Sequence, residues 1–518
     1  MVNDTTSNGK LLEEEAKSPS YDSGINTVTE DAQDDPNEFS SVRQAVILGI
    51  FCLALFVDAF MTGAMIICLD SIRSEFNAPS SIVSWVVTSY SLTFGSLLLL
   101  AGRICDIYHP KPVFITGFLF IGVVGIGGGF SKNIITLIVI RALQGIGAAM
   151  TIPSATSMLT AAYTSTRSQG IALTFFAAGG TLGLCLGFVL GGIIVQFASW
   201  RWVIWVVPII TIPLSAVSIL LIPNNQRARG SDDNKMDIPG VVVLTGSLIL
   251  LIFSLSQAPI TGWGKARVLA PLVISIAMVV AFFVWQTRLN EKHALIPPKM
   301  WFIPNFLVLI FVSFCTQIYL TGPILVFSEF WPVAYDWSAL TIGLHVLPMG
   351  LTSTIICVLL PRQILQMPPR LALICANLMA GLLSILLVYS SKESRYWSYT
   401  FPSMILITAG STAAYMISNV GIITSVPPDK VGVAAAIFSA AQQVGGAINV
   451  AVITTVLVEV QNKHPFPSYK GPSSAFWFVV ALGIAQAIMV LLLFKPQTVQ
   501  EVTSIDAVGE EKGEVATA

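Results

Sequence analysis

About fourteen apolar runs, each close to the length of a membrane span, follow one another between residues 44 and 494. A helix needs about twenty mostly apolar residues to cross the hydrocarbon core of a bilayer. Only 11% of the residues are charged, whereas soluble domains carry about 25%. The sequence therefore predicts an all-α integral membrane protein with about fourteen transmembrane helices. The expected spans are 44–68, 82–101, 113–130, 134–160, 169–195, 202–222, 239–258, 269–287, 305–326, 340–360, 371–390, 400–424, 432–458 and 474–494. The least regular are 305–326, which contains Gly322-Pro323, and 340–360, which contains Pro348.

Polar stretches divide this pattern into parts. Residues 1–42 and 496–518 are polar, and we expect both to be disordered cytosolic tails because they cannot bury enough apolar surface. The loop 223–238 is the most polar interior connection. We therefore expect a six-helix half at 43–222, two inserted helices at 239–287 and a second six-helix half at 288–495.

A short motif recurs in the two expected halves. Gly170-Ile-Ala is followed by Gly183, and Gly432-Val-Ala is followed at the same separation by Gly445. Halves related by internal symmetry are typical of secondary transporters, which hold a small-molecule substrate between them. The repeat predicts two pseudo-symmetric halves.

Charge and cysteine usage narrow the functional class. Lys and Arg are more frequent in the loops on the side of the N-terminus, which favours cytosolic termini. The net charge of -1 argues against a nucleic-acid partner, and the seven cysteines show no metal-binding spacing. We find no phosphate-binding loop and no nucleophile motif, so we expect neither an enzyme nor a cofactor, and no metal site.

Two charged residues lie inside apolar runs. Arg141 stands in the fourth run and Asp58 in the first. A charge at membrane depth is costly unless it faces protein or water, so such residues are candidate functional sites. We expect Asp58 to carry a proton whose binding Arg141 controls. The alternatives are that Arg141 is a structural anchor bonded to backbone carbonyls, and that Asp58 is a satisfied polar residue near a helix end.

The fifth run is rich in glycine. Gly183, Gly187 and Gly191 recur every fourth residue, so they share one face of a helix. A face without side chains lets another helix approach to backbone distance. We expect this face to move against a helix of the other half, namely the span that carries Gly445. The alternative is tight static packing.

Several motifs together carry a resemblance to a known family. They are Asp58, Trp85-Val-Val-Thr-Ser-Tyr90, Gly102-Arg103-Ile-Cys-Asp106-Ile-Tyr-His-Pro-Lys111, Arg141-Ala-Leu-Gln144-Gly145-Ile-Gly147, the segment from Gly179 to Gly192, and Gln443-Val-Gly445-Gly446. With these motifs the chain resembles the major facilitator superfamily, and within it the fourteen-span drug:proton antiporter group. The loop that ends at Lys111 is similar to that of fungal aminotriazole-resistance-type transporters. The chain departs from the family at Ile107, His109 and Pro110 in this loop, and at Phe188 in the fifth span.

The resemblance implies roles for these residues. Asp58 and Arg141 would couple transport to protons, and Arg141, Gln144, Gly145 and Gly147 form the fourth-span motif. Gly102, Arg103, Asp106 and Lys111 would form a cytosolic gate, although this loop can also be a solvated connector. The antiporter motif comprises Gly179, Gly183, Gly187, Gly191 and Gly192.

Other polar residues in the spans can line a central cavity, or can form single interhelical hydrogen bonds. The candidates are Trp85, Tyr90, Gln317, Tyr319, Tyr415, Asn419, Gln442 and Gln443. Glu329 and Asp336 flank a predicted external loop and are expected to be solvated.

The function that we expect is proton-coupled efflux of small organic toxins, drugs or secondary metabolites by alternating access. The protein would be a monomer in the lipid bilayer of the plasma membrane, or alternatively of the vacuole. Two other functions stay open: a carrier of a small inorganic solute such as borate or ammonium, or of a siderophore, and a non-transporting membrane sensor.

Overall fold

The computed structural model describes residues 41–163, 166–222, 237–289, 296, 298–426, 431–465 and 467–495. The predicted tails and most of the loop 223–238 lie outside these residues. Every regular element in the described part of the chain is a helix. The first, α1 (Ser41–Phe76), begins two residues inside the segment expected to be a tail.

Fourteen helical segments among the described residues are long and apolar enough to cross a membrane, as predicted. The first seven spans are formed by α1, α3 (Trp85–Ile107), α4 (Pro110–Gly129), α5 (Ile134–Ala162), α6 (Thr166–Phe197), α7 (Trp200–Leu221) and α8 (Ile238–Thr261). The other seven are formed by α9 (Ala266–Arg288), α10 (Phe306–Thr316) with α11 (Ile318–Tyr335), α12 (Ala339–Leu359), α14 (Pro369–Leu383) with α15 (Ile385–Val388), α16 (Phe401–Ser425), α17 (Val431–Lys463) and α18 (Lys470–Leu493). Shorter elements are α2 (Ser80–Val83), α13 (Pro361–Gln366), η1 (Pro298–Phe302), η2 (Glu393–Arg395) and η3 (Tyr396–Thr400).

The ninth span is broken, but not where Gly322-Pro323 suggests. The two helices α10 and α11 meet at Gln317, while Pro323 lies inside α11. A proline clashes with the carbonyl of the fourth residue before it, here Tyr319, so the distortion lies on its N-terminal side. The tenth span, α12, runs without a break through Pro348.

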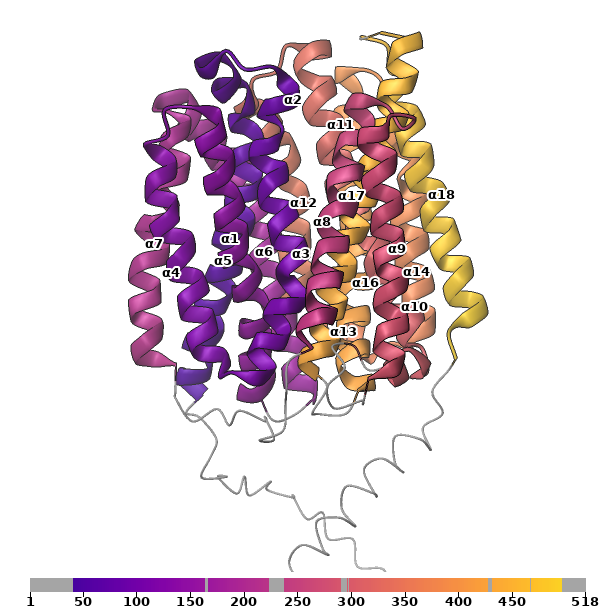
Figure 1. Ribbon diagram of the computed structural model, residues 1–518. Coiled ribbons are helices and arrows are strands. Elements are labelled where there is room, and N and C mark those ends of the chain that lie inside the picture. The colour runs from indigo at the N-terminus through magenta and orange to yellow at the C-terminus, as the bar shows by residue number, and fades with distance from the viewer. Residues whose placement is uncertain are drawn as a thin grey trace, which may run out of the picture. The chain divides into compact units, whose positions relative to one another are not determined.

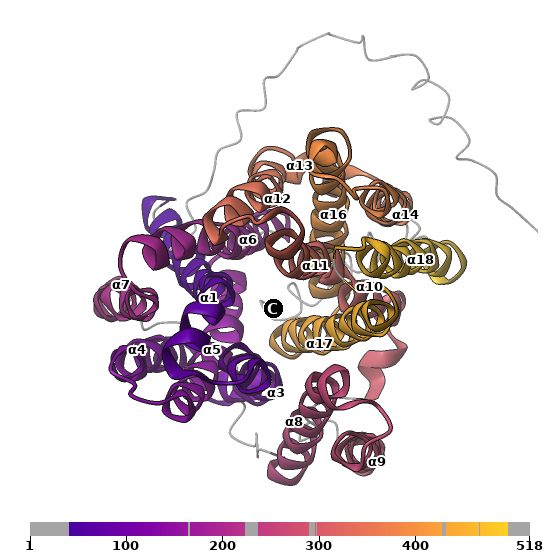
Figure 2. The same cartoon turned by 90° about the horizontal axis from the view of Figure 1, so that it is seen from above.

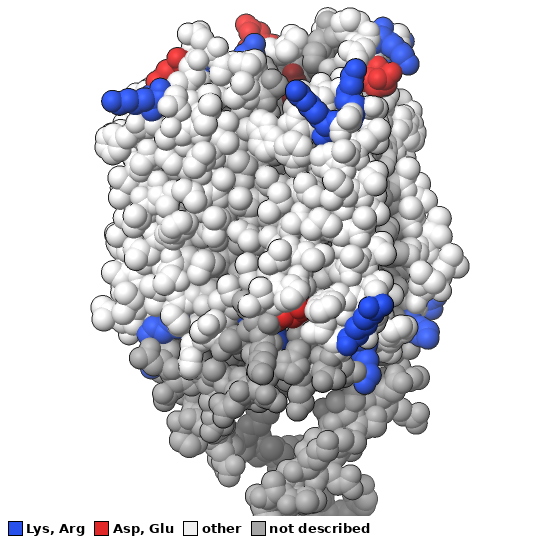
Figure 3. Space-filling view, in the orientation of Figure 1, with Lys and Arg blue, Asp and Glu red and all other residues white. Residues whose placement is uncertain are grey.

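The charged side chains support a membrane setting. On the face drawn in Figure 3, Lys, Arg, Asp and Glu gather near the upper and lower ends, and a wide band between them is uncharged. In the orientation of Figure 1, α1 begins at the lower end and finishes at the upper end. Both names are used below in this sense.

The helices form two groups that match the expected halves. Figure 2 shows α1 and α3–α7 in one group and α10–α18 in the other. The groups meet where α6 packs on α12 and where α3 packs on α17. This arrangement confirms the predicted fold class.

Equivalent contacts reveal the internal symmetry. A Cβ on Gly183 of α6 would collide with the carbonyl of Phe56 in α1, and a Cβ on Gly445 of α17 would collide with the carbonyl of Phe314 in α10. Each repeated glycine therefore packs against the first helix of its own half. The repeat seen in the sequence corresponds to a repeat in structure.

The two inserted helices lie beside the place where the halves meet. Figure 2 shows α8 next to both α3 and α17, with α9 outside it. The ring centroids of Phe253 in α8 and Trp85 in α3 lie 5.7 Å apart. Beyond the end of α8, the Trp263 indole donates to the Thr455 hydroxyl of α17 at 3.0 Å. The hairpin thus contacts both halves.

A buried carboxylate fixes this hairpin at its lower end. Asp237 is 5% exposed and accepts hydrogen bonds from the Gly240 amide at 2.9 Å, the Trp285 indole at 3.0 Å and the Gln286 amide group at 2.7 Å. The first bond caps α8, and the other two tie α8 to α9. An acid just before an apolar run is a helix-start signal that the sequence analysis did not use.

Candidate functional site

Asp58, Tyr90 and Arg141 come together from three helices of the first half. Asp58 lies in α1, Tyr90 in α3 and Arg141 in α5. The Tyr90 hydroxyl donates to Asp58 Oδ1, and the Arg141 guanidinium lies over the Tyr90 ring, 4.4 Å from its centroid. Asp58 and Arg141 form no ion pair among the described residues, so the tyrosine joins the acid to the cation.

Arg141 is fully enclosed by protein. Its side chain is 0% exposed, Nε donates to the Val86 carbonyl at 3.1 Å, and Nη1 donates to Gln144 Oε1 at 3.2 Å. Gln144 in turn donates to the Ile121 carbonyl at 3.3 Å. Nη2 has no hydrogen-bond partner in the structure. One backbone carbonyl fits the anchor interpretation, but an unbonded charged N–H group keeps Arg141 available to an anion.

The Asp58 carboxylate is only half-buried. It can therefore exchange a proton with water while the Tyr90 hydroxyl holds its orientation. When the carboxylate is charged, the nearby guanidinium and the hydroxyl stabilise it; when it is protonated, both interactions weaken. This arrangement is chemically suited to reversible proton binding.

We expect Arg141→Lys to impair transport at least about tenfold, nearly as much as Arg141→Ala, because an ammonium lacks the planar fork that reaches Val86 and Gln144 together. Uptake should be measured at matched membrane abundance. The control is Arg73→Lys, which changes an exposed arginine at the upper end of α1. Wild-type activity of the Arg141→Lys protein would show that a point charge suffices.

The fourth-span glycines pack α5 against its neighbours. A Cβ on Gly145 would lie 2.5 Å from the Tyr90 carbonyl of α3, and a Cβ on Gly147 would lie 2.7 Å from the Gly117 carbonyl of α4. Gly145 therefore brings α5 close to the helix that carries Tyr90. The motif positions Arg141 over the tyrosine ring.

The loop between α3 and α4 joins parts of both halves. A Cβ on Gly102 would lie 2.7 Å from the Cβ of Ala436 in α17, across the halves. Arg103 is 8% exposed. Lys111 Nζ donates to the Ile219 and Ile222 carbonyls at 2.9 and 2.6 Å, and so caps the end of α7. The side chain of Asp106 lies outside the part of the chain that the structure describes, and the gate remains a prediction.

The prediction for the partner of the glycine face is wrong. Gly179, Gly187 and Gly191 lie against Cys52, Phe60 and Ala64 of α1, not against α17. Gly183 packs on the same helix, and Gly192 is buried. Spacing identifies a face of a helix but not the helix that covers it. Across the halves, α6 instead meets α12, where a Cβ on Gly343 would lie 3.0 Å from the carbonyl oxygen of Phe188.

The candidate cavity residues separate into two sets. Tyr319 is 0% exposed and donates to Gln486 Oε1 at 2.5 Å, so its position fits the interhelical alternative. Trp85 packs on Phe253 of the inserted hairpin, and Tyr90 contacts Asp58. The remaining candidates are half-buried or nearly so on the second half: Gln317, Tyr415, Asn419, Gln442 and Gln443.

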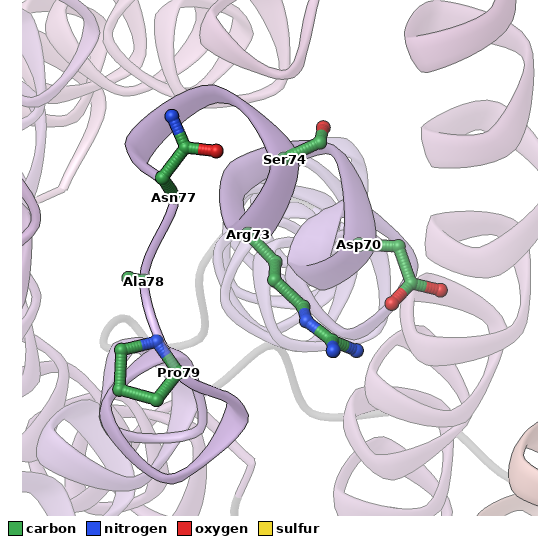
Figure 4. Close-up of a pocket in the computed structure, with 6 residues that line it drawn as sticks. All are labelled: Asp70, Arg73, Ser74, Asn77, Ala78 and Pro79. Atoms are coloured by element: carbon green, nitrogen blue, oxygen red, sulfur yellow. The ribbon is translucent and has the colours of Figure 1, made fainter.

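An open hollow of about 610 Å³ lies at the upper end of α1. In Figure 4 the side chains of Asp70 and Arg73 extend toward the same side of this helix, and Asn77 and Pro79 border the hollow. Asp70 follows Asp58 by twelve residues, or about 18 Å along a helix. The hollow is therefore separate from the Asp58 cluster. The sequence analysis did not identify it, because both charges fall beside the expected end of the first span.

The comparisons with known proteins agree with this architecture. The family model described as Major Facilitator Superfamily matches residues 51–449. The chain is 30% identical over 404 residues to the puromycin resistance protein pur8 of Streptomyces alboniger, covering 75% of this chain and 77% of that one. It is 29% identical to the cephamycin export protein CmcT of Amycolatopsis lactamdurans, with coverage of 88% and 93%. It is 24% identical to the low affinity ammonium transporter of Saccharomyces cerevisiae, with coverage of 85% and 87%.

The solved structure of the proton:xylose symporter XylE matches with a TM-score of 0.61 at 12% identity, covering 90% of this chain and 100% of that one. This likeness concerns the fold alone. The fourteen spans and the drug-resistance relatives fit the fourteen-span drug:proton antiporter group. The chain belongs to the Major Facilitator Superfamily of membrane transporters.

Proposed function

We propose that the protein exports small organic compounds, such as drugs, toxins or secondary metabolites, in exchange for protons. The observation that carries this proposal is the Asp58–Tyr90–Arg141 cluster, which places a half-buried carboxylate next to a fixed cation inside the first half. The printed names of the puromycin and cephamycin relatives support an organic cargo. We place both termini in the cytosol and the protein in the plasma membrane.

The proposed mechanism is alternating access between two halves. Residues 43–222 and 288–495 would rock as units about the α6–α12 and α3–α17 contacts, with the inserted helices 239–287 beside the second. Asp58 would bind a proton when it is open to the outside and release it when it is open to the cytosol. Substrate would occupy the space between the halves when Asp58 is charged.

The experiment uses purified protein in vesicles with an acidic interior. Labelled organic compounds without a titratable amine are added outside, because such compounds do not follow a pH gradient on their own. We expect at least one compound to accumulate, and a protonophore to abolish the accumulation. Protein-free vesicles are the control. Accumulation that is unaffected by the protonophore would contradict proton coupling.

The ammonium transporter among the relatives favours a second candidate, transport of a small inorganic cation. Labelled methylammonium, tested in the same vesicles and corrected by the protein-free control, distinguishes the two. Protein-dependent methylammonium uptake without uptake of any organic compound would favour the second candidate.

A further inference from the structure

We infer that Glu329 of α11 is a recognition site for lipophilic organic cations at the space between the two halves. The inference rests on the proposed function, since it names the class of compound that the transporter takes. Glu329 lies in the ninth span, six residues before α11 ends at Tyr335. That separation places it about 9 Å along the helix from its end.

The side chain of Glu329 is exposed, although those around it in sequence are not. Phe327, Phe330 and Trp331 are at most 2% exposed. The expectation that Glu329 lies beside a solvated loop therefore needs correction, because its backbone is part of a spanning helix. An acid at this depth must face water or protein rather than lipid.

The packing of α11 indicates which way Glu329 faces. Five helices of the second half contact α11, namely α10, α12, α16, α17 and α18. From the first half, Ile66 and Ile67 of α1 pack against the buried cluster that holds Phe327 and Phe330. The remaining side of α11 is thus turned toward the first half, as its place at the inner edge of the second half in Figure 2 also indicates.

No cation compensates the Glu329 carboxylate within the protein. Among the described residues, Glu329 has neither an ion pair nor a hydrogen bond. The two ion pairs printed for the described part of the chain, Arg201–Glu75 and Lys463–Glu459, involve other residues. A charge that the fold leaves without a partner in a spanning helix is available to a charged ligand.

The neighbours of Glu329 on its own face determine the rest of the chemistry. Leu325 precedes it by four residues and Val333 follows it by four, so the three lie on one side of the helix. Val333 is 61% exposed and Leu325 is half-buried. A carboxylate between two apolar side chains fits a cation with an apolar body better than it fits a small hydrated ion.

The probe pair is tetraphenylphosphonium and tetraphenylborate, which share a shape and differ in the sign of their charge. Equilibrium binding of each is measured on purified protein in lipid nanodiscs, with no ion gradient. We expect the wild-type protein to bind the cation saturably and to prefer it over the anion. Glu329→Gln should raise the Kd for the cation about tenfold or more and leave anion binding unchanged or stronger, because the lost interaction is a charge pair.

Two further variants separate recognition from folding. Glu329→Asp keeps the charge and should retain the cation preference. Asp336→Asn removes an exposed acid seven residues later, where φ is 54°, a conformation that asparagine adopts readily, and should bind as the wild type does. Loss of the preference in Glu329→Asp, or equal cation binding by Glu329→Gln and wild type, would overturn the inference. So would absence of saturable cation binding by the wild type.

Because binding is measured without a gradient, the test does not depend on proton-coupled export. Transport of organic compounds by a protein that fails to bind the cation would overturn the site and leave the proposed function standing. Cation binding that depends on Glu329, in a protein that transports nothing, would do the reverse.

Discussion

Asp58→Asn is expected to reduce transport driven by a pH gradient to the level of protein-free vesicles. Asparagine keeps the size of aspartate and retains an oxygen that can accept the Tyr90 hydrogen bond. It cannot bind or release a proton. The folded protein should therefore persist in the membrane while coupling is lost.

The decisive measurement compares two modes of transport in the same vesicles. Asp58→Asn should lose uphill accumulation in acid-loaded vesicles, yet it should still exchange labelled substrate for unlabelled substrate at equal pH. Exchange needs the halves to move but needs no net proton transfer. The matched control is Asp70→Asn, an exposed acid at the upper end of the same helix, which should retain both modes. Uphill accumulation by Asp58→Asn at the wild-type rate would remove this residue from the coupling mechanism.

The spans and the charged site residues could be predicted because each depends on the chain's own chemistry. Apolar length alone decides whether a helix can cross a bilayer, so all fourteen spans were predictable. Arg141 and Asp58 are conspicuous because charge is rare in apolar runs. What no run of residues reveals is that Tyr90 of α3 lies between them, because that depends on how α1, α3 and α5 pack.

Relations between helices account for the other differences. The glycine row predicts a close approach, but both α1 and a helix of the other half could have supplied the partner. Glu329 reads from sequence as a loop residue because the expected span ends at 326, whereas α11 continues to Tyr335. Its apolar neighbours Phe330 and Trp331 are the signal that could have extended the span.

The second large effect concerns this glycine row, and its observed partner changes what we expect. Since α1 and α6 belong to the same half, the row holds that half together rather than sliding between halves. A Cβ on Gly187 would lie 2.5 Å from the Phe60 carbonyl oxygen and 3.0 Å from the Ala64 amide nitrogen. Leucine there would force the two helices apart and destabilise the protein by about 3 kcal/mol or more, since overpacking has little room to relax.

We therefore expect Gly187→Leu to lose most of its folded protein, measured as monodisperse material after detergent extraction and as a lowered Tm. Gly49→Leu is the matched control, because a Cβ on Gly49 of α1 has nothing within 4 Å. It should retain wild-type abundance and transport. The comparison isolates the packed face from the general effect of a bulky residue in a span.

Gly343→Leu tests the contact that does lie between the halves. A Cβ there would lie 3.0 Å from the Phe188 carbonyl oxygen of α6, so leucine should prevent α12 from closing on α6 at this point. Because each half keeps its own packing, abundance should fall much less than in Gly187→Leu, whereas cysteine accessibility should shift toward one state and transport should fall. A Gly187→Leu protein with normal abundance and Tm but altered accessibility would show the opposite: that α1 and α6 move against each other during transport, and that the first half is not a rigid unit.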